Sequence, residues 1–96
     1  MSESEKRYAQ NPDFIYRRIV DEMILVPIHQ DIADLDCIYS LNSLGAFIWE
    51  QLETPATRHE LGKAIQAEFD TDERTIQRDL DPFLQEMVLL GAIRVN

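Results

Sequence analysis

The side chains that could carry out chemistry are few and widely separated in this sequence. His29 and His59 are the two histidines, and neither has a second ligand at the spacing that zinc and related metals use. Cys37, the single cysteine, lies in an apolar run, where a lone cysteine usually packs as a small hydrophobic side chain. Ser43 lacks the Gly-x-Ser-x-Gly turn that exposes a serine nucleophile. The sequence therefore predicts no metal, no cofactor and no catalytic residue, so we do not expect an enzyme.

Acidic side chains dominate the charge of the chain. Eighteen Asp and Glu against nine Lys and Arg give a net charge of −9. Nucleic-acid binding depends on cations that neutralise phosphates, and the last predicted helix exposes mostly acids beside Arg74 and Arg78. We therefore expect no nucleic-acid partner, and the charge favours basic or mixed-charge partners.

Length and composition indicate one small domain with a packed core. The chain has 96 residues, of which 45% are hydrophobic. Its apolar runs are too short to cross a membrane, and the N-terminal segment lacks the apolar stretch of a secretory signal. A single cysteine cannot form an internal disulfide, which fits a reducing compartment. We expect a cytoplasmic protein without a membrane partner.

The elements that would position any site follow from the hydrophobic patterns. Residues 1–13 show no periodicity and are predicted to be a flexible tail, which leaves 14–96 as the domain. Strands are predicted at 14–20, 22–28, 37–41 and 92–95, with a polar loop at 29–36, and helices at about 43–53, 57–69 and 72–90. The order β-β-β-α-α-α-β predicts an α+β fold resembling a winged helix-turn-helix.

Helix ends are marked by capping residues. Asn42 or Ser43 is expected to cap the first helix, and Thr57 with Glu60 forms a capping box for the second. Asp70 in the motif Asp70-x-x-Glu73 is expected to cap the third helix, and Gly91 is expected to end it. Pro82 lacks a backbone N–H and clashes with the preceding turn, so a kink or a restart is expected there.

The apolar arc of the third helix is unusually wide. Ile76, Leu80 and Phe83 lie along one line with Met87, and Leu84 and Val88 extend the arc on one flank. Two interpretations stay open. Either the domain covers this helix on two sides, which geometry alone favours, or the Leu84 and Val88 flank forms one wall of an apolar groove.

The chain resembles the PqqD-like family in a run of short motifs. They are Leu41-Asn42, the small-residue helix start Ser43 to Ala46, the pair Ile48-Trp49, the helix start Thr57 to Leu61, and Phe83-Leu84…Leu90-Gly91. The resemblance covers about residues 20–95. This sequence departs from the family in its longer acidic segment at 29–36 and in Pro82.

The resemblance implies a non-catalytic adaptor for ribosomally made peptides. Such domains bind the leader of a precursor peptide by strand addition and present it to a modifying enzyme, often of the radical-SAM type. The implied peptide-binding residues are Cys37, Ile38, Tyr39, Ser40 and Leu41 on the third strand and Arg74, Gln77, Arg78, Asp81, Leu84 and Val88 on the third helix. The alternative is a winged-helix regulator that binds DNA or another protein.

Overall fold

The structure is a computed structural model that describes residues 6–19, 22–28 and 39–95. Its elements are β1 (Arg7–Gln10), β2 (Phe14–Ile19), β3 (Glu22–Pro27), β4 (Tyr39–Leu41), α1 (Ser43–Gln51), β5 (Ala56–Thr57), α2 (Arg58–Phe69), α3 (Glu73–Leu90) and β6 (Ile93–Val95). The predicted α+β class is confirmed. The predicted order lacked two strands, β1 and β5.

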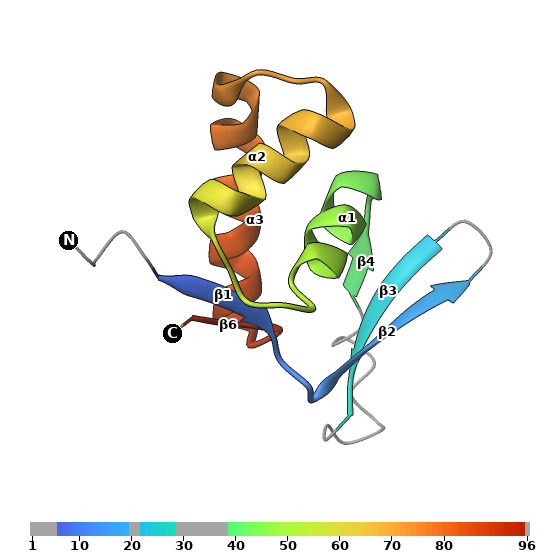
Figure 1. Ribbon diagram of the computed structural model, residues 1–96. Helices are drawn as coiled ribbons and strands as arrows, with labels where there is room; N and C mark the ends of the chain where they lie inside the picture. The colour runs from blue at the N-terminus through green and yellow to red at the C-terminus, as the bar shows by residue number, and fades with distance from the viewer. Residues whose placement is uncertain (1–5, 20–21, 29–38, 96) are drawn as a thin grey trace.

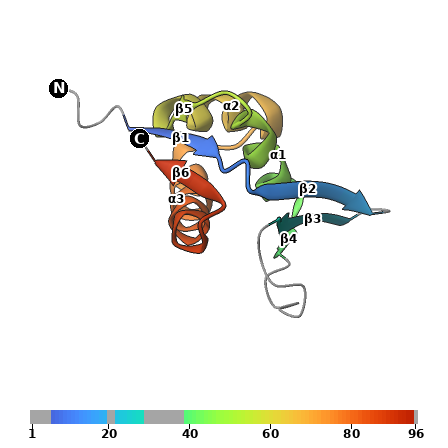
Figure 2. The same ribbon diagram turned by 90° about the horizontal axis from the view of Figure 1, so that it is seen from below.

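The predicted hairpin and third strand form one antiparallel sheet in the order β2-β3-β4. β2 and β3 pair from Phe14 opposite Pro27 to Ile19 opposite Glu22, so that Pro27 occupies the last pair of the ladder. β4 pairs with β3 on the opposite side from β2. In Figure 1, β4 lies between α1 and the hairpin of β2 and β3, and in Figure 2 it lies on the far side of β3 from β2.

A second sheet corrects the prediction of a flexible tail at residues 7–10, whereas residues 1–5 of that predicted tail lie outside the described residues. Residues 7–10 form β1, the central strand of the order β5-β1-β6. Gln10 donates its Nε2 to the carbonyl of Trp49 at 2.6 Å, and Asn11 donates its Nδ2 to the carbonyl of Gly91 at 2.7 Å. These bonds tie the N-terminal segment to the ends of α1 and α3. The partners of β1 are far away in the sequence, so local periodicity gave no sign of the strand.

Removal of β1 is therefore expected to destabilise the domain. A chain that starts at Asp13 loses both ladders of the small sheet and the anchors made by Gln10 and Asn11. A chain that starts at Lys6 keeps all of these contacts and is the matched control. Urea denaturation followed by Trp49 fluorescence should show a lower midpoint only for the shorter chain. Equal midpoints for the two chains would support the flexible tail instead.

Most of the predicted capping residues are found at the ends of the helices. Asn42 caps α1 by accepting a hydrogen bond from the backbone N–H of Gly45, and Thr57 forms the predicted box with Glu60. The predicted Asp70 cap of α3 is wrong. Asp70 instead ends α2 in a left-handed conformation, with φ of 50°, and the cap of α3 is Asp72, which accepts from Thr75. Gly91 ends α3 at φ of 95°, as predicted.

α3 does not restart at Pro82, as the sequence had suggested it could. The helix is assigned as one continuous element of 18 residues with Pro82 inside it. Pro82 is exposed, so water can reach the carbonyl of Arg78 that has no N–H partner at position 82. Asp81 is therefore not the cap of a second helical segment.

The core lies where the three helices meet the inner faces of the sheets. Its fully buried side chains include Leu25, Ile48, Leu52, Leu61, Ile65, Ile76, Leu80, Met87 and Ile93. Trp49 is also buried, and Phe47 packs edge-on against the partly exposed Phe69 at 5.3 Å between ring centroids. None of the helices in the described part of the chain has the length and apolarity that a membrane crossing needs.

Candidate functional site

β4 is an edge strand among the described residues. Tyr39, Ser40 and Leu41 pair with Leu25, Ile24 and Met23 of β3, and no other described strand pairs with β4. In an antiparallel pair, alternate residues turn both backbone groups away from the partner strand. The outer edge of β4 therefore presents either Ser40 or the pair Tyr39 and Leu41. Cys37 and Ile38, which the sequence placed in the same strand, lie outside the described residues.

The side chains of β4 contact both β3 and α3. Leu41 is buried in the core, whereas Ser40 is exposed on the opposite face. Ser40 donates its hydroxyl to Glu22 at 2.9 Å, and Tyr39 donates its hydroxyl to Glu86 of α3 at 3.0 Å. The hydrogen bond to Glu86, with a smaller effect of desolvation, raises the pKa of Tyr39 above its ordinary value of 10.0. The phenol is therefore protonated at neutral pH and can donate to this carboxylate.

The corner between β4 and α1 brings α1 close to α3. Asn42 Oδ1 accepts from the N–H of Gly45 at 2.8 Å, which starts α1 directly after the strand. A Cβ atom at Gly45 would lie 3.1 Å from a ring carbon of Phe83 and 3.2 Å from Asn42 Oδ1. The small residue at this position therefore allows the start of α1 to pack against the middle of α3.

A hollow opens between the start of α1 and one side of α3. Its volume is about 410 Å³, and it is lined by Asn42, Leu44, Gly45, Ile48, Arg78, Asp79, Pro82, Phe83 and Glu86. The apolar surface comes from both helices, and the charged groups come from α3. A smaller apolar hollow of about 170 Å³, which Leu44 and Asp79 also line, extends toward Phe69. A groove of this kind can hold apolar side chains below a polar rim.

The predicted residues of α3 do not all face this hollow. Arg78 lines it, whereas Asp81, Leu84 and Val88 line a separate hollow of about 430 Å³ together with Tyr8 of β1 and Val95 of β6. Leu84 is only 3% exposed. Arg74 and Gln77 are exposed and line neither hollow. The wide apolar arc therefore reflects burial on two sides, with β1 and β6 covering the Leu84 flank.

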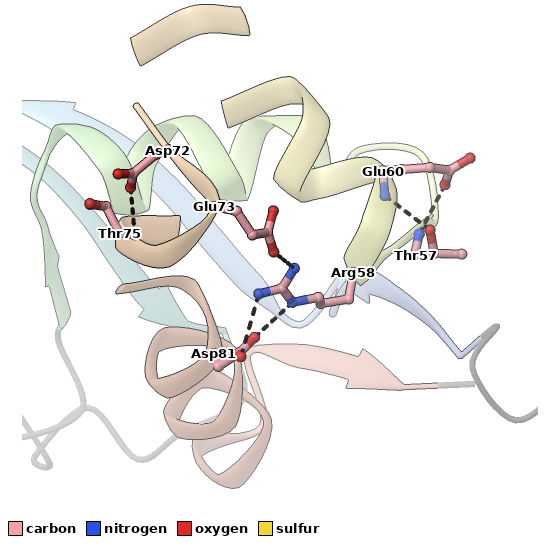
Figure 3. A network of polar contacts seen from close by, with 7 residues as sticks. All are labelled: Thr57, Arg58, Glu60, Asp72, Glu73, Thr75 and Asp81. Carbon is pink, nitrogen blue, oxygen red and sulfur yellow. Dashed lines mark hydrogen bonds and ion pairs between the residues drawn. The ribbon is translucent and has the colours of Figure 1, made fainter. Parts of the chain in front are cut away.

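Asp81 is held by an ion pair with the start of α2. Arg58 donates Nε to Asp81 Oδ1 at 2.9 Å and Nη2 to Oδ2 at 3.4 Å, and its Nη1 reaches Glu73 at 3.4 Å (Figure 3). The hydrogen bond to Asp81 raises the pKa of Arg58, although burial acts in the opposite direction. This bidentate pair joins α2 to α3. The sequence had placed Asp81 beside a bound peptide, but its carboxylate points to α2.

Sequence reasoning missed several residues of the hollow. None of Asp79, Pro82, Phe83 and Glu86 was among the predicted binding residues, yet they line one side of α3 together. Their spacing of three, one and three residues was a signal that they share a helix face. The sequence contained no signal that this face, and not the Leu84 face, lies next to β4.

The described residues hold no group of three or more His, Cys, Asp or Glu side chains that could bind a metal ion. His59 is exposed near the start of α2, and Ser43 is exposed in the first turn of α1. Neither side chain forms a hydrogen bond or an ion pair with another residue of the described ranges. His29 and Cys37 lie outside the described residues.

The fold and the hollow define a small α+β domain that presents an open strand edge beside an apolar helix surface. The model of the family described as coenzyme PQQ synthesis protein D (PqqD) matches residues 22–93, and the chain belongs to this family. A solved structure, TbiB1 in complex with the TbiA(beta) leader peptide, is similar over 90% of this chain and 94% of that chain, with 26% identity and a TM-score of 0.72. A search of curated proteins found no match.

Proposed function

We propose that this protein binds the leader segment of a ribosomally made precursor peptide as an added strand on the open edge of β4. The observation that carries the proposal is the similarity to TbiB1, which extends over nearly all of both chains. The TbiB1 structure contains a bound leader peptide. Membership of the PqqD family supports the same function. Strand addition fits because backbone hydrogen bonds supply affinity, while neighbouring pockets select the side chains.

The position of β4 gives an added strand a place to lie. A peptide on the outer edge of β4 would run on the side that faces α3 (Figure 2). It would lie about 4.8 Å from β4, which is the usual spacing of neighbouring strands. There it would contact the hollow between Asn42 and Gly45 of α1 and Arg78 to Glu86 of α3. The proposed site therefore keeps Tyr39–Leu41 of the predicted strand, together with Arg78. Its helix side moves from the Leu84 flank to the flank of Pro82 and Phe83.

The protein would act as an adaptor and leave the chemistry to a partner enzyme. The described residues contain no metal cluster, and the exposed His59 and Ser43 have no catalytic neighbours. A peptide-modifying enzyme, with a radical-SAM protein as the first candidate, would receive the bound leader in the cytoplasm. Duplex-DNA binding has little support because Glu73, Asp81 and Glu86 are exposed on α3.

The proposal can be tested with the leader of a short precursor peptide encoded beside the gene for this protein. Addition of the synthetic peptide to ¹⁵N-labelled protein should shift the amide signals of Tyr39 to Leu41 and of Arg78 to Glu86. Hydrogen exchange should slow at alternate residues of β4, either Ser40 or Tyr39 with Leu41, because added-strand bonds form only on the outer edge. A scrambled peptide is the control. Shifts confined to β1, β6 and α2 would contradict the proposed site.

A further inference from the structure

We infer that the leader presents a basic side chain to Glu86 and, beside it, a large apolar side chain to the hollow between α1 and α3. This inference rests on the proposed strand addition at β4 and specifies which peptides that site accepts. It is carried by three features of the described residues, namely the Tyr39–Glu86 hydrogen bond, the absence of a cationic partner for Glu86, and the apolar floor beside it.

The Tyr39–Glu86 bond spans the place where the peptide would enter. Tyr39 belongs to the edge strand and Glu86 to α3, and the 3.0 Å bond joins their side chains. Glu86 also lines the hollow, so its carboxylate lies at the border between the strand edge and the apolar surface. A peptide strand that pairs with β4 places its inward side chains next to this carboxylate.

Glu86 has a neutral donor where a cation would bind more strongly. In the described part of the chain Glu86 forms no ion pair, and its one hydrogen-bond partner is the Tyr39 hydroxyl. The Tyr39 hydroxyl leaves the negative charge of Glu86 uncompensated, whereas Lys or Arg would add a coulombic attraction to the hydrogen bond, and Arg can donate to both carboxylate oxygens. Lys or Arg of the leader would therefore pair with Glu86 beside the Tyr39 hydroxyl or in its place. The net charge of −9 attracts such a peptide from a distance.

The hollow beside Glu86 accounts for the apolar part of the inference. Leu44, Ile48 and Phe83 line it, and its volume of about 410 Å³ is large enough for an aromatic or branched aliphatic side chain. Leu44 also lines the smaller hollow toward Phe69, so a long apolar side chain can continue in that direction.

The opposite charge preference, an acidic leader bound by arginines, has weaker support. Arg78 is the one cation that lines the hollow among the described residues, and its Nε donates to the adjacent Asp79 at 3.3 Å. Asp79 lines the hollow as well, which leaves two carboxylates and one cation there. The surplus of negative charge favours a basic side chain over an acidic one.

A phage-displayed library of random peptides tests the inference even while the natural leader is unidentified. Selection on the wild-type protein should enrich Lys or Arg near a large apolar residue. Selection on Glu86→Lys should lose this basic enrichment and gain Asp or Glu. The matched control is Glu68→Lys, which places the same charge change on an exposed position of α2 outside the hollow and should select the same peptides as the wild type.

Affinities of one enriched peptide provide the second measurement. Glu86→Gln should weaken binding about two- to fivefold, as expected for a partly exposed ion pair. Tyr39→Phe keeps the ring and frees Glu86, so it should leave the affinity equal or tighter. A clear loss on Tyr39→Phe would show that the Tyr39–Glu86 bond shapes the groove, and would overturn the inference.

Failure of the proposed function and failure of the role of Glu86 give different results. If no selected peptide shifts the amide signals of β4, the proposed function itself is wrong. If selected peptides bind at β4 without basic residues, or select identically on Glu86→Lys, strand addition stands and the role of Glu86 is wrong. Circular dichroism of each variant confirms that the exposed substitutions leave the fold intact.

Discussion

Leu80→Ala is expected to lower the free energy of unfolding by about 2–5 kcal/mol, as large-to-small substitutions in a packed core do. Leu80 is 0% exposed and lies on the face of α3 that also carries the buried Ile76 and Met87. Truncation removes apolar contacts and leaves a cavity that the surrounding helices fill only in part. Chemical denaturation of the purified protein measures this loss.

Leu89→Ala is the matched control for this experiment. It is the same substitution on the same helix, but Leu89 is 84% exposed. Its expected effect is within about 0.5 kcal/mol of the wild type, because no cavity forms at an exposed position. Similar losses for the two variants would mean that the buried face of α3 has been assigned incorrectly.

Pro82→Ala is expected to stabilise the domain and to weaken peptide binding. Proline is about 3 kcal/mol less favourable than alanine inside a helix, and alanine restores an N–H donor for the carbonyl of Arg78. Part of this gain is offset because proline also restricts the unfolded chain. We therefore expect a gain of about 1–3 kcal/mol in the free energy of unfolding.

The expected loss of binding has a separate cause. Pro82 lines the hollow between α1 and α3, and its ring is part of the surface that a leader side chain would contact. Gln85→Ala changes the opposite hollow and serves as the control. Denaturation and peptide titration of both variants measure the two effects. If Pro82→Ala destabilised the protein, the expectation would be wrong, because the proline would then contribute to the stability of the fold.

Several features of the fold were determined by local sequence. The cap at Thr57 was identified, and Asn42 was one of the two residues predicted to cap the first helix, because a capping side chain acts on an N–H only two or three residues away. Ile76, Leu80 and Met87, which were predicted to lie along one apolar line of the third helix, are buried, because helical periodicity indicates which face is apolar. The family motifs likewise lie in continuous segments, and the family assignment from them is confirmed.

Contacts between distant segments determine two features that local sequence patterns did not predict, namely β1 and the packing on the Leu84 side of α3. β1 exists because residues 7–10 pair with residues 56–57 and 93–95, and a four-residue strand has no periodicity of its own to report this. The same contacts cover the Leu84 side of α3. The sequence predicted a broad apolar arc on this helix, but an arc has two flanks and periodicity does not say what packs on each.

The candidate site depends on that choice. The sequence indicated an edge strand followed by a capped helix, and β4 and α1 are found there. Only the tertiary structure turned Arg78, Phe83 and Glu86 toward that strand and placed the small sheet beside the Leu84 flank. The rotation of a helix about its axis is fixed by everything that packs against it, and for α3 those partners come from both ends of the chain.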